Sequence, residues 1–132
     1  LPPDWHPGGP HQPDGDFTIV CDGNGGIKIA DPKGYDRKNA DPCVQECVDK
    51  HEYCHRDEVL QSNPNICVGQ PAGTEIGGRD SIVDRSEVRC AQVEIDCLNA
   101  RKGDCSCSDA AITGALKREE KYRDRFKNKP GL

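Results

Sequence analysis

Cysteine content is the feature that most restricts how this chain can fold: nine of its 132 residues are cysteines. Only 33% of the residues are hydrophobic and 5% are aromatic, so any apolar core must be thin. A small core depends on cross-links for its stability. The sequence contains no C-x-x-C pair of the kind that holds structural zinc, and cytosolic proteins rarely carry so many cysteines. We therefore predict a disulfide framework of four bridges and one remaining thiol, whose connectivity the sequence leaves open.

The chain divides into an arm and a single domain. Residues 1–15 are rich in Pro and Gly and are typical of a linker or extended arm, and residues 16–132 are expected to form the domain. Methionine is absent even at position 1, which favours a segment of a longer protein or a processed form. The net charge of −5 argues against a nucleic-acid partner. No run approaches the ~18 apolar residues of a membrane span, so we expect no stable membrane insertion.

The first half of the domain contains signals for a hairpin and a helix. Two β-type runs, residues 17–20 and 27–29, flank the turn sequence "DGNGG", which predicts a β-hairpin. Asp41 is a suitable N-cap, and Pro42 suits the first position of a helix. This helix is expected to continue to about residue 60, where "SNPN" ends it.

Two further helices are expected in the second half. One begins near residue 80 and ends near residue 100, and the other is capped by Ser108 and continues toward residue 126. The charged sequence "KREEKYRDRFKN" near the C-terminus is interpreted as a solvated helix face. The predicted fold is mostly α with a small β-hairpin (α+β), compact and disulfide-stapled.

The first predicted helix carries cysteines and histidines on one broad face. At about 100° per residue, Cys43, Cys47 and Cys54 fall within about 40° of one another, and His51 and His55 lie beside them. The disulfides and a histidine site can therefore coexist on this helix. We expect at least three native bridges. At least one should join this cysteine stripe to the later cysteines, which are Cys90, Cys97, Cys105 and Cys107.

The same helix contains the motif H-E-x-x-H as "HEYCH", residues 51–55. Residues i and i+4 lie on one helix face, so His51 and His55 can bind one Zn²⁺ together. Zinc lowers the pKa of bound water toward ~7, and Glu52 between the ligands would take the proton of that water and deliver it to the leaving amine. The motif predicts a zinc metallopeptidase.

A hydrolytic zinc site needs a third protein ligand, and no histidine follows His55 in the sequence. Glu87 is our first choice because it lies on the apolar face of the second predicted helix, where a carboxylate is unfavourable without a cation. Glu94 is the second choice, but it lies about 10 Å further along the helix, so both cannot easily bind one ion. Asp57 and Asp80 are weaker candidates.

Residues 17–98 resemble the zinc-metallopeptidase toxin domains of bacterial Rhs-type polymorphic toxins and related type VI secretion effectors. The resemblance is carried by "FTIVCDGNGGIKI", the Cys43–Cys47 approach to "HEYCH", "NPNICVGQPAG" and "SEVRCAQVEIDCL". It implies a zincin-like domain of gluzincin type with His51, His55 and Glu87 as ligands and Glu52 as base. It further implies secretion, delivery into a target bacterium with action in the periplasm, a protein or peptide substrate, and a cognate immunity protein.

Two other classes of function remain open from the sequence. "CDGNGG" followed by "CVDKHEYC" is similar to the calcium loop and His-containing helix of secreted phospholipase A2, in which His51 would be the base of a calcium-dependent lipid hydrolase. Against this, Cys47 is one residue too far from His51, Glu52 replaces an Asp, and His55 would have no role. The third class is a non-enzymatic, disulfide-rich binding module, in which the histidines are ordinary residues of a stapled helix.

Overall fold

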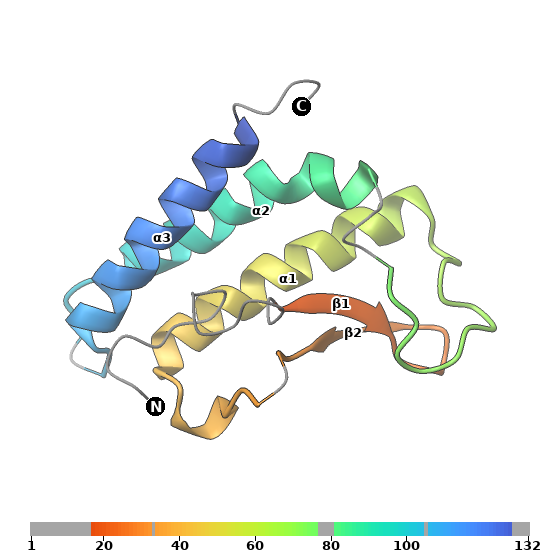
Figure 1. The fold of residues 1–132 in the computed structure, drawn as a ribbon, viewed down its shortest axis with the longest axis horizontal. Coiled ribbons are helices and arrows are strands. Elements are labelled where there is room, and N and C mark those ends of the chain that lie inside the picture. The colour runs from red at the N-terminus through yellow and green to blue at the C-terminus, as the bar shows by residue number, and fades with distance from the viewer. Residues whose placement is uncertain (1–16, 33, 77–80, 105, 128–132) are drawn as a thin grey trace.

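The computed structural model describes residues 17–32, 34–76, 81–104 and 106–127. The predicted arm at residues 1–15, Asp80 and Cys105 lie outside the described residues. The elements in chain order are β1 (Thr18–Cys21), β2 (Ile27–Ala30), a 3₁₀ turn η1 (Arg37–Asn39), α1 (Pro42–Ser62), α2 (Ser81–Ala100) and α3 (Asp109–Lys127). This confirms the predicted fold, in which three helices accompany one small hairpin (Figure 1).

The hairpin forms where the "DGNGG" turn predicted it. β1 and β2 pair antiparallel, from Thr18 opposite Ala30 to Cys21 opposite Ile27. The Asp22 carboxylate accepts the backbone N–H groups of Asn24 at 2.7 Å and Gly26 at 3.0 Å, which closes the turn.

Asp41 fixes the starts of two helices. Its Oδ1 accepts the backbone N–H groups of Cys43 and Val44, both at 3.0 Å, which confirms it as the N-cap of α1. Its Oδ2 accepts the N–H of Ser108 at 2.9 Å, directly before α3. Ser108 in turn accepts the N–H of Ala111 at 3.1 Å, as expected for the cap of α3.

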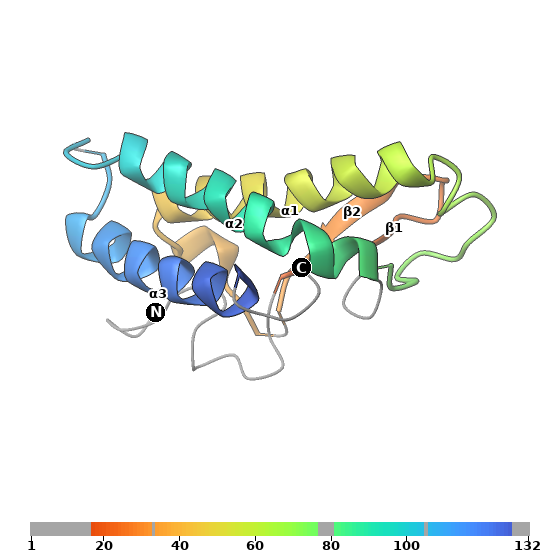
Figure 2. The same cartoon turned by 90° about the horizontal axis from the view of Figure 1, so that it is seen from above.

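α1 is the central element of the fold. It contacts the hairpin and α2, and α2 in turn packs against α3. In Figure 1, the hairpin lies on one side of α1 and α2 lies on the other, and Figure 2 shows the three helices from above. None of the helices among the described residues is long and apolar enough to cross a membrane.

Two groups of buried apolar residues follow from this arrangement. The larger group, the main core, lies chiefly between the three helices and includes Cys47, Val48, Leu98 and Ile112. The smaller group, the hairpin core, joins β1 to the end of α1 and the loop after it. Its buried members are Ile19, Cys21, Val59, Cys67 and Ile76.

Four disulfides join these elements, in agreement with the predicted framework. The pairs are Cys21–Cys67, Cys43–Cys107, Cys47–Cys97 and Cys54–Cys90. Three of them connect the cysteine stripe of α1 to α2 or to the segment just before α3, as the stripe predicted. Such bridges form and persist in oxidising surroundings, extracellular or periplasmic.

Candidate metal centre

The centre lies at the interface of α1 and α2, between two disulfides. On α1, Cys47 lies one turn before His51, and Cys54 comes directly before His55. Their bridges to α2 hold the two helices in a fixed register around the histidines. Both imidazoles are buried, and His55 is only 2% exposed. The face of α1 predicted to point inward therefore does so.

The Nε2 atoms of the two histidines converge with the Glu87 carboxylate. His51 Nε2 lies 3.1 Å from His55 Nε2. Glu87 Oε1 is 2.9 Å from His55 Nε2, and Glu87 Oε2 is 3.6 Å from His51 Nε2. Two ligand atoms on a tetrahedral zinc ion with bonds of ~2.0–2.1 Å lie about 3.3 Å apart. The observed spacings are close to this value, so these three side chains could together bind a metal ion.

The Nδ1 atoms of both rings are held by other residues of α2. His51 Nδ1 lies 2.7 Å from Glu94 Oε1, and because a carboxylate only accepts, the ring donates its Nδ1–H there. His55 Nδ1 contacts the hydroxyl of Ser86. With its Nδ1 protonated, a neutral His51 ring presents the Nε2 lone pair to His55 and Glu87. The site between these groups can therefore be completed either by a hydrogen on His55 Nε2 or by a metal ion.

Glu87 supports the metal alternative. Its Oε2 is buried and has no hydrogen-bond partner among the described residues. Burial opposes a charge on this carboxyl group, but contact with His51 and His55 outweighs burial and lowers the pKa of Glu87 to about 2. A buried, ionised oxygen without a partner is costly, and a metal ion between the imidazoles would remove that cost.

Three carboxyl groups, from Glu87, Glu94 and Glu119, contact the two histidines, and the Glu52 carboxyl interacts electrostatically with His51. Burial, reinforced by the neighbouring Glu94, raises the pKa of Glu119 to about 7. Burial opposes a charge on His51, yet Glu119, Glu87 and Glu94 raise the pKa of its imidazole well above the usual range. The centre is thus rich in negative groups and attracts cations.

Glu52, the predicted base, is buried next to the ligands. The residue is only 8% exposed. Burial raises the pKa of Glu52 to about 8, and Glu87, Glu94 and Glu119 add to the rise while His51 opposes it. A pKa raised toward neutrality suits this carboxyl group to exchange a proton.

The remaining predicted ligands do not join His51 Nε2, His55 Nε2 and Glu87. Asp57 is exposed and pairs with Arg56 at 3.0 Å, and Asp80 lies outside the described residues. Glu94 is present at the centre, but it contacts the Nδ1 atom of His51 and not the Nε2 side, where Glu87 lies. Among the six candidates for a metal ligand, the structure therefore brings together the ligand atoms of His51, His55 and Glu87.

Sequence reasoning missed two residues of this centre. Ser86 gave no signal beyond its position next to Glu87. Glu119 belongs to the charged segment that we interpreted as a solvated helix face, yet its Oε1 lies 3.1 Å from His51 Nδ1 and is buried. That interpretation is wrong for Glu119, because α3 turns this one carboxylate toward α1 and α2.

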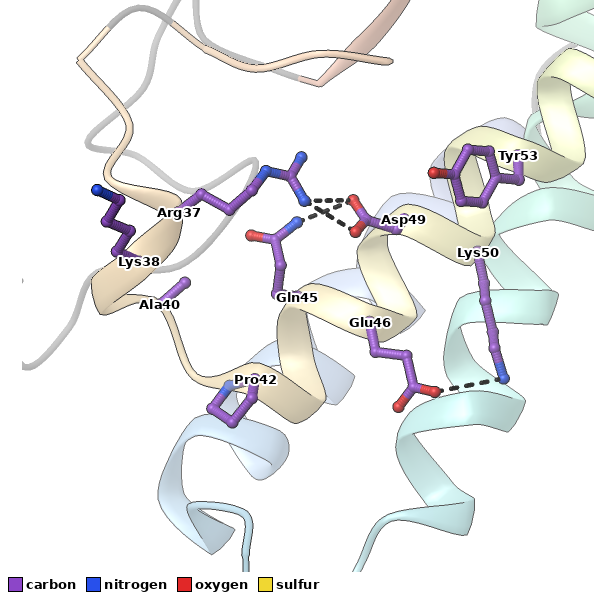
Figure 3. Close-up of a pocket in the computed structure, with 9 residues that line it drawn as sticks. All are labelled: Arg37, Lys38, Ala40, Pro42, Gln45, Glu46, Asp49, Lys50 and Tyr53. Carbon is purple, nitrogen blue, oxygen red and sulfur yellow. Dashed lines mark hydrogen bonds and ion pairs between the residues drawn. The ribbon is translucent and has the colours of Figure 1, made fainter. Parts of the chain in front are cut away.

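The 22–26 turn and a surface pocket are two further places where polar side chains gather. In the 22–26 turn, which the phospholipase-like alternative assigned to a calcium loop, the Asp22 carboxylate accepts backbone N–H groups of Asn24 and Gly26. A surface pocket of about 630 Å³ is lined by residues between 37 and 53 (Figure 3). Its carboxylates are neutralised within the pocket, since Asp49 pairs with Arg37 and Glu46 with Lys50. We assign no chemistry to it.

Comparison of the chain with protein-family models, with curated proteins and with solved structures gave no match. No family assignment follows, and the function has to be inferred from the residues of the centre.

Proposed function

We propose that this protein is a zinc-dependent metallopeptidase whose metal ion is held by His51, His55 and Glu87. The observation that carries the proposal is the convergence of two buried imidazole nitrogens on a buried carboxylate, one oxygen of which makes no hydrogen bond to a described residue. The remaining α2 contacts of the histidines are on their Nδ1 atoms, so the Nε2 atoms are free to face a metal ion.

The donor set favours zinc over calcium or magnesium. Calcium and magnesium prefer oxygen ligands, whereas imidazole nitrogens suit zinc. Two histidines and one glutamate are three protein ligands, which is the number found in hydrolytic zinc sites that keep one position open. The four neighbouring cysteine sulfurs do not compete as ligands, because they are bonded to one another in the Cys47–Cys97 and Cys54–Cys90 disulfides.

Zinc would supply a Lewis acid that makes water nucleophilic near neutral pH and polarises a peptide carbonyl. The protein's own contribution to proton transfer is Glu52. A general base must lie beside the reacting water and not be consumed as a ligand. Glu52 follows His51 directly in the sequence and is buried, as the ligands are. We assign to its carboxylate the removal of a proton from water and the return of that proton to the leaving amine.

The proposed setting is that of an antibacterial toxin domain, which acts on a protein or peptide in the periplasm of a target bacterium and is neutralised by an immunity protein. This part rests on the resemblance of residues 17–98 to such toxin domains. The disulfides support it to the extent that they suit an oxidising compartment.

Metal content and peptide hydrolysis measured on four variants test the proposal. His51→Ala and His55→Ala should lose zinc and activity together, whereas Glu52→Gln should keep stoichiometric zinc and lose activity by at least ~100-fold. Glu58→Gln is the matched control on the same helix, since Glu58 pairs with Arg89 away from the centre, and it should change neither. Wild-type protein without zinc, or full activity in Glu52→Gln, would show that the proposal is wrong.

A further inference from the structure

His51 has two carboxylates at a single nitrogen atom. Glu94 Oε1 of α2 lies 2.7 Å from its Nδ1, and Glu119 Oε1 of α3 lies 3.1 Å from the same atom. An imidazole has one hydrogen at Nδ1, and that hydrogen can form a short, linear bond to only one acceptor. One carboxylate therefore orients the ring, and the other is a neighbour.

Geometry identifies Glu94 as the acceptor. Its contact with Nδ1 meets the requirements of a hydrogen bond, and the bond is buried. Glu119 Oε1 is within ion-pair distance of Nδ1 but outside hydrogen-bond geometry, so it remains buried without a hydrogen-bond partner among the described residues. Glu94 also shares α2 with Glu87, so the helix that provides the third metal ligand also provides the group that orients the first.

We propose that Glu94 is a positioning residue of the metal centre. By accepting the Nδ1–H of His51, its carboxylate fixes the tautomer that presents Nε2 to the metal, holds the plane of the ring, and makes Nε2 a better donor. Removal of the hydrogen-bond partner of a metal-bound histidine typically weakens metal binding by about 10–100-fold. This inference rests on the proposed zinc site, but it concerns a residue to which that proposal gave no role.

A second metal ion at His51 Nδ1, Glu94 and Glu119 is the competing interpretation, because these atoms also lie close enough together to hold one. It would require His51 to lose both ring protons in order to bind one ion at each nitrogen. A neutral imidazole keeps one ring N–H, so the two sites exclude each other at ordinary pH. One zinc ion per chain is therefore expected.

Zinc affinity, measured by competition with a chromophoric chelator, separates these possibilities. Glu94→Gln should weaken binding about 10–100-fold relative to the wild type, because an amide oxygen is a weaker acceptor than a carboxylate. Glu119→Gln should weaken binding less than Glu94→Gln does. Glu120→Gln, at the exposed neighbouring position on α3, is the matched control and should leave zinc affinity unchanged. Glu94→Asp retains the charge one methylene further back and should recover part of the loss. If Glu94→Gln does not fold, the zinc affinity of Glu94→Asp tests the positioning role in its place.

NMR of the metal-free protein provides a readout that does not depend on zinc. The Nδ1 proton of His51 should be shifted downfield and exchange slowly in the wild type and in Glu119→Gln, and it should lose both properties in Glu94→Gln. If the wild type binds one zinc ion and Glu94→Gln binds it equally well, the positioning role is wrong while the zinc site stands. If the wild type binds no zinc, the proposed function fails, and the positioning role fails with it. Two zinc ions per chain would replace this inference by the second site.

Discussion

The hairpin end of the molecule and the metal centre are stabilised in opposite ways, although α1 contributes to both. The hairpin core buries Ile19, Val59 and Ile76 around the Cys21–Cys67 disulfide, and its residues need no ligand. The metal centre buries two histidines and several carboxyl groups, which are costly to remove from water unless a cation compensates them. Apolar burial and one disulfide account for the first region, whereas the buried carboxyl groups of the second are costly without a compensating cation.

Removal of a disulfide should have the largest effect and should distinguish the two regions. The Cys54–Cys90 and Cys21–Cys67 bridges close segments with separations of 36 and 46 residues. Their entropic stabilisation therefore differs by only roughly 0.2 kcal/mol. Replacing either pair by serine should lower the free energy of unfolding by about 2–5 kcal/mol, measured with denaturant.

Zinc affinity should separate these two double variants. Cys54→Ser with Cys90→Ser should weaken zinc binding, because Cys54 precedes His55 and Cys90 lies one turn after Glu87. Cys21→Ser with Cys67→Ser should leave zinc affinity unchanged. Equal losses of affinity in both double variants would mean that the two ends of the molecule are not independent.

Metal removal should have the next largest effect and should be confined to one region. A ligand present at 100 times its dissociation constant stabilises the folded state by ~2.7 kcal/mol. Chelation should therefore lower the thermal midpoint. Hydrogen exchange should become faster in α2 near residues 86–94 and remain unchanged in β1 and β2. Faster exchange throughout the chain would contradict a local role for the metal ion.

Loss of an exposed ion pair between the same helices should have the smallest effect. Arg89 of α2 forms two hydrogen bonds with Glu58 of α1, at 2.7 and 3.0 Å, and its side chain is largely exposed. Exposed pairs contribute about 0.2–1 kcal/mol, so Arg89→Ala should lower the free energy of unfolding by no more than that and leave zinc binding intact. A larger loss would show that surface charges, and not the buried centre and its disulfides, hold α1 against α2.

Much of the fold followed from local signals in the sequence. The "DGNGG" turn, the Asp41 cap and the inward stripe of cysteines on α1 each depend on residues close together in the chain, and the structure confirms all three. The disulfide partners could not be assigned beforehand, because their choice depends on how α2 and α3 pack against α1.

The metal centre was only partly predictable for the same reason. The i, i+4 spacing of His51 and His55 is a local property, and Glu87 stood out as a carboxylate on an apolar helix face. Glu94 was expected to lie too far along α2 to share an ion with Glu87. The spacing along the helix could not show that Glu94 contacts the other nitrogen of His51. Glu119 lies seven, four and three residues after the buried Ile112, Ala115 and Leu116, so it continues the apolar face of α3. The many charges of the surrounding segment hid this signal.

X-ray absorption at the zinc edge of the purified wild-type protein tests the central claim most directly. The account predicts one zinc ion per chain with nitrogen and oxygen ligands at ~2.0–2.2 Å, imidazole scattering from two histidines, and no sulfur ligand. A zinc–sulfur distance of ~2.3 Å would contradict it by moving the metal to the cysteines. A protein that contains no zinc after purification and does not take it up would contradict it entirely.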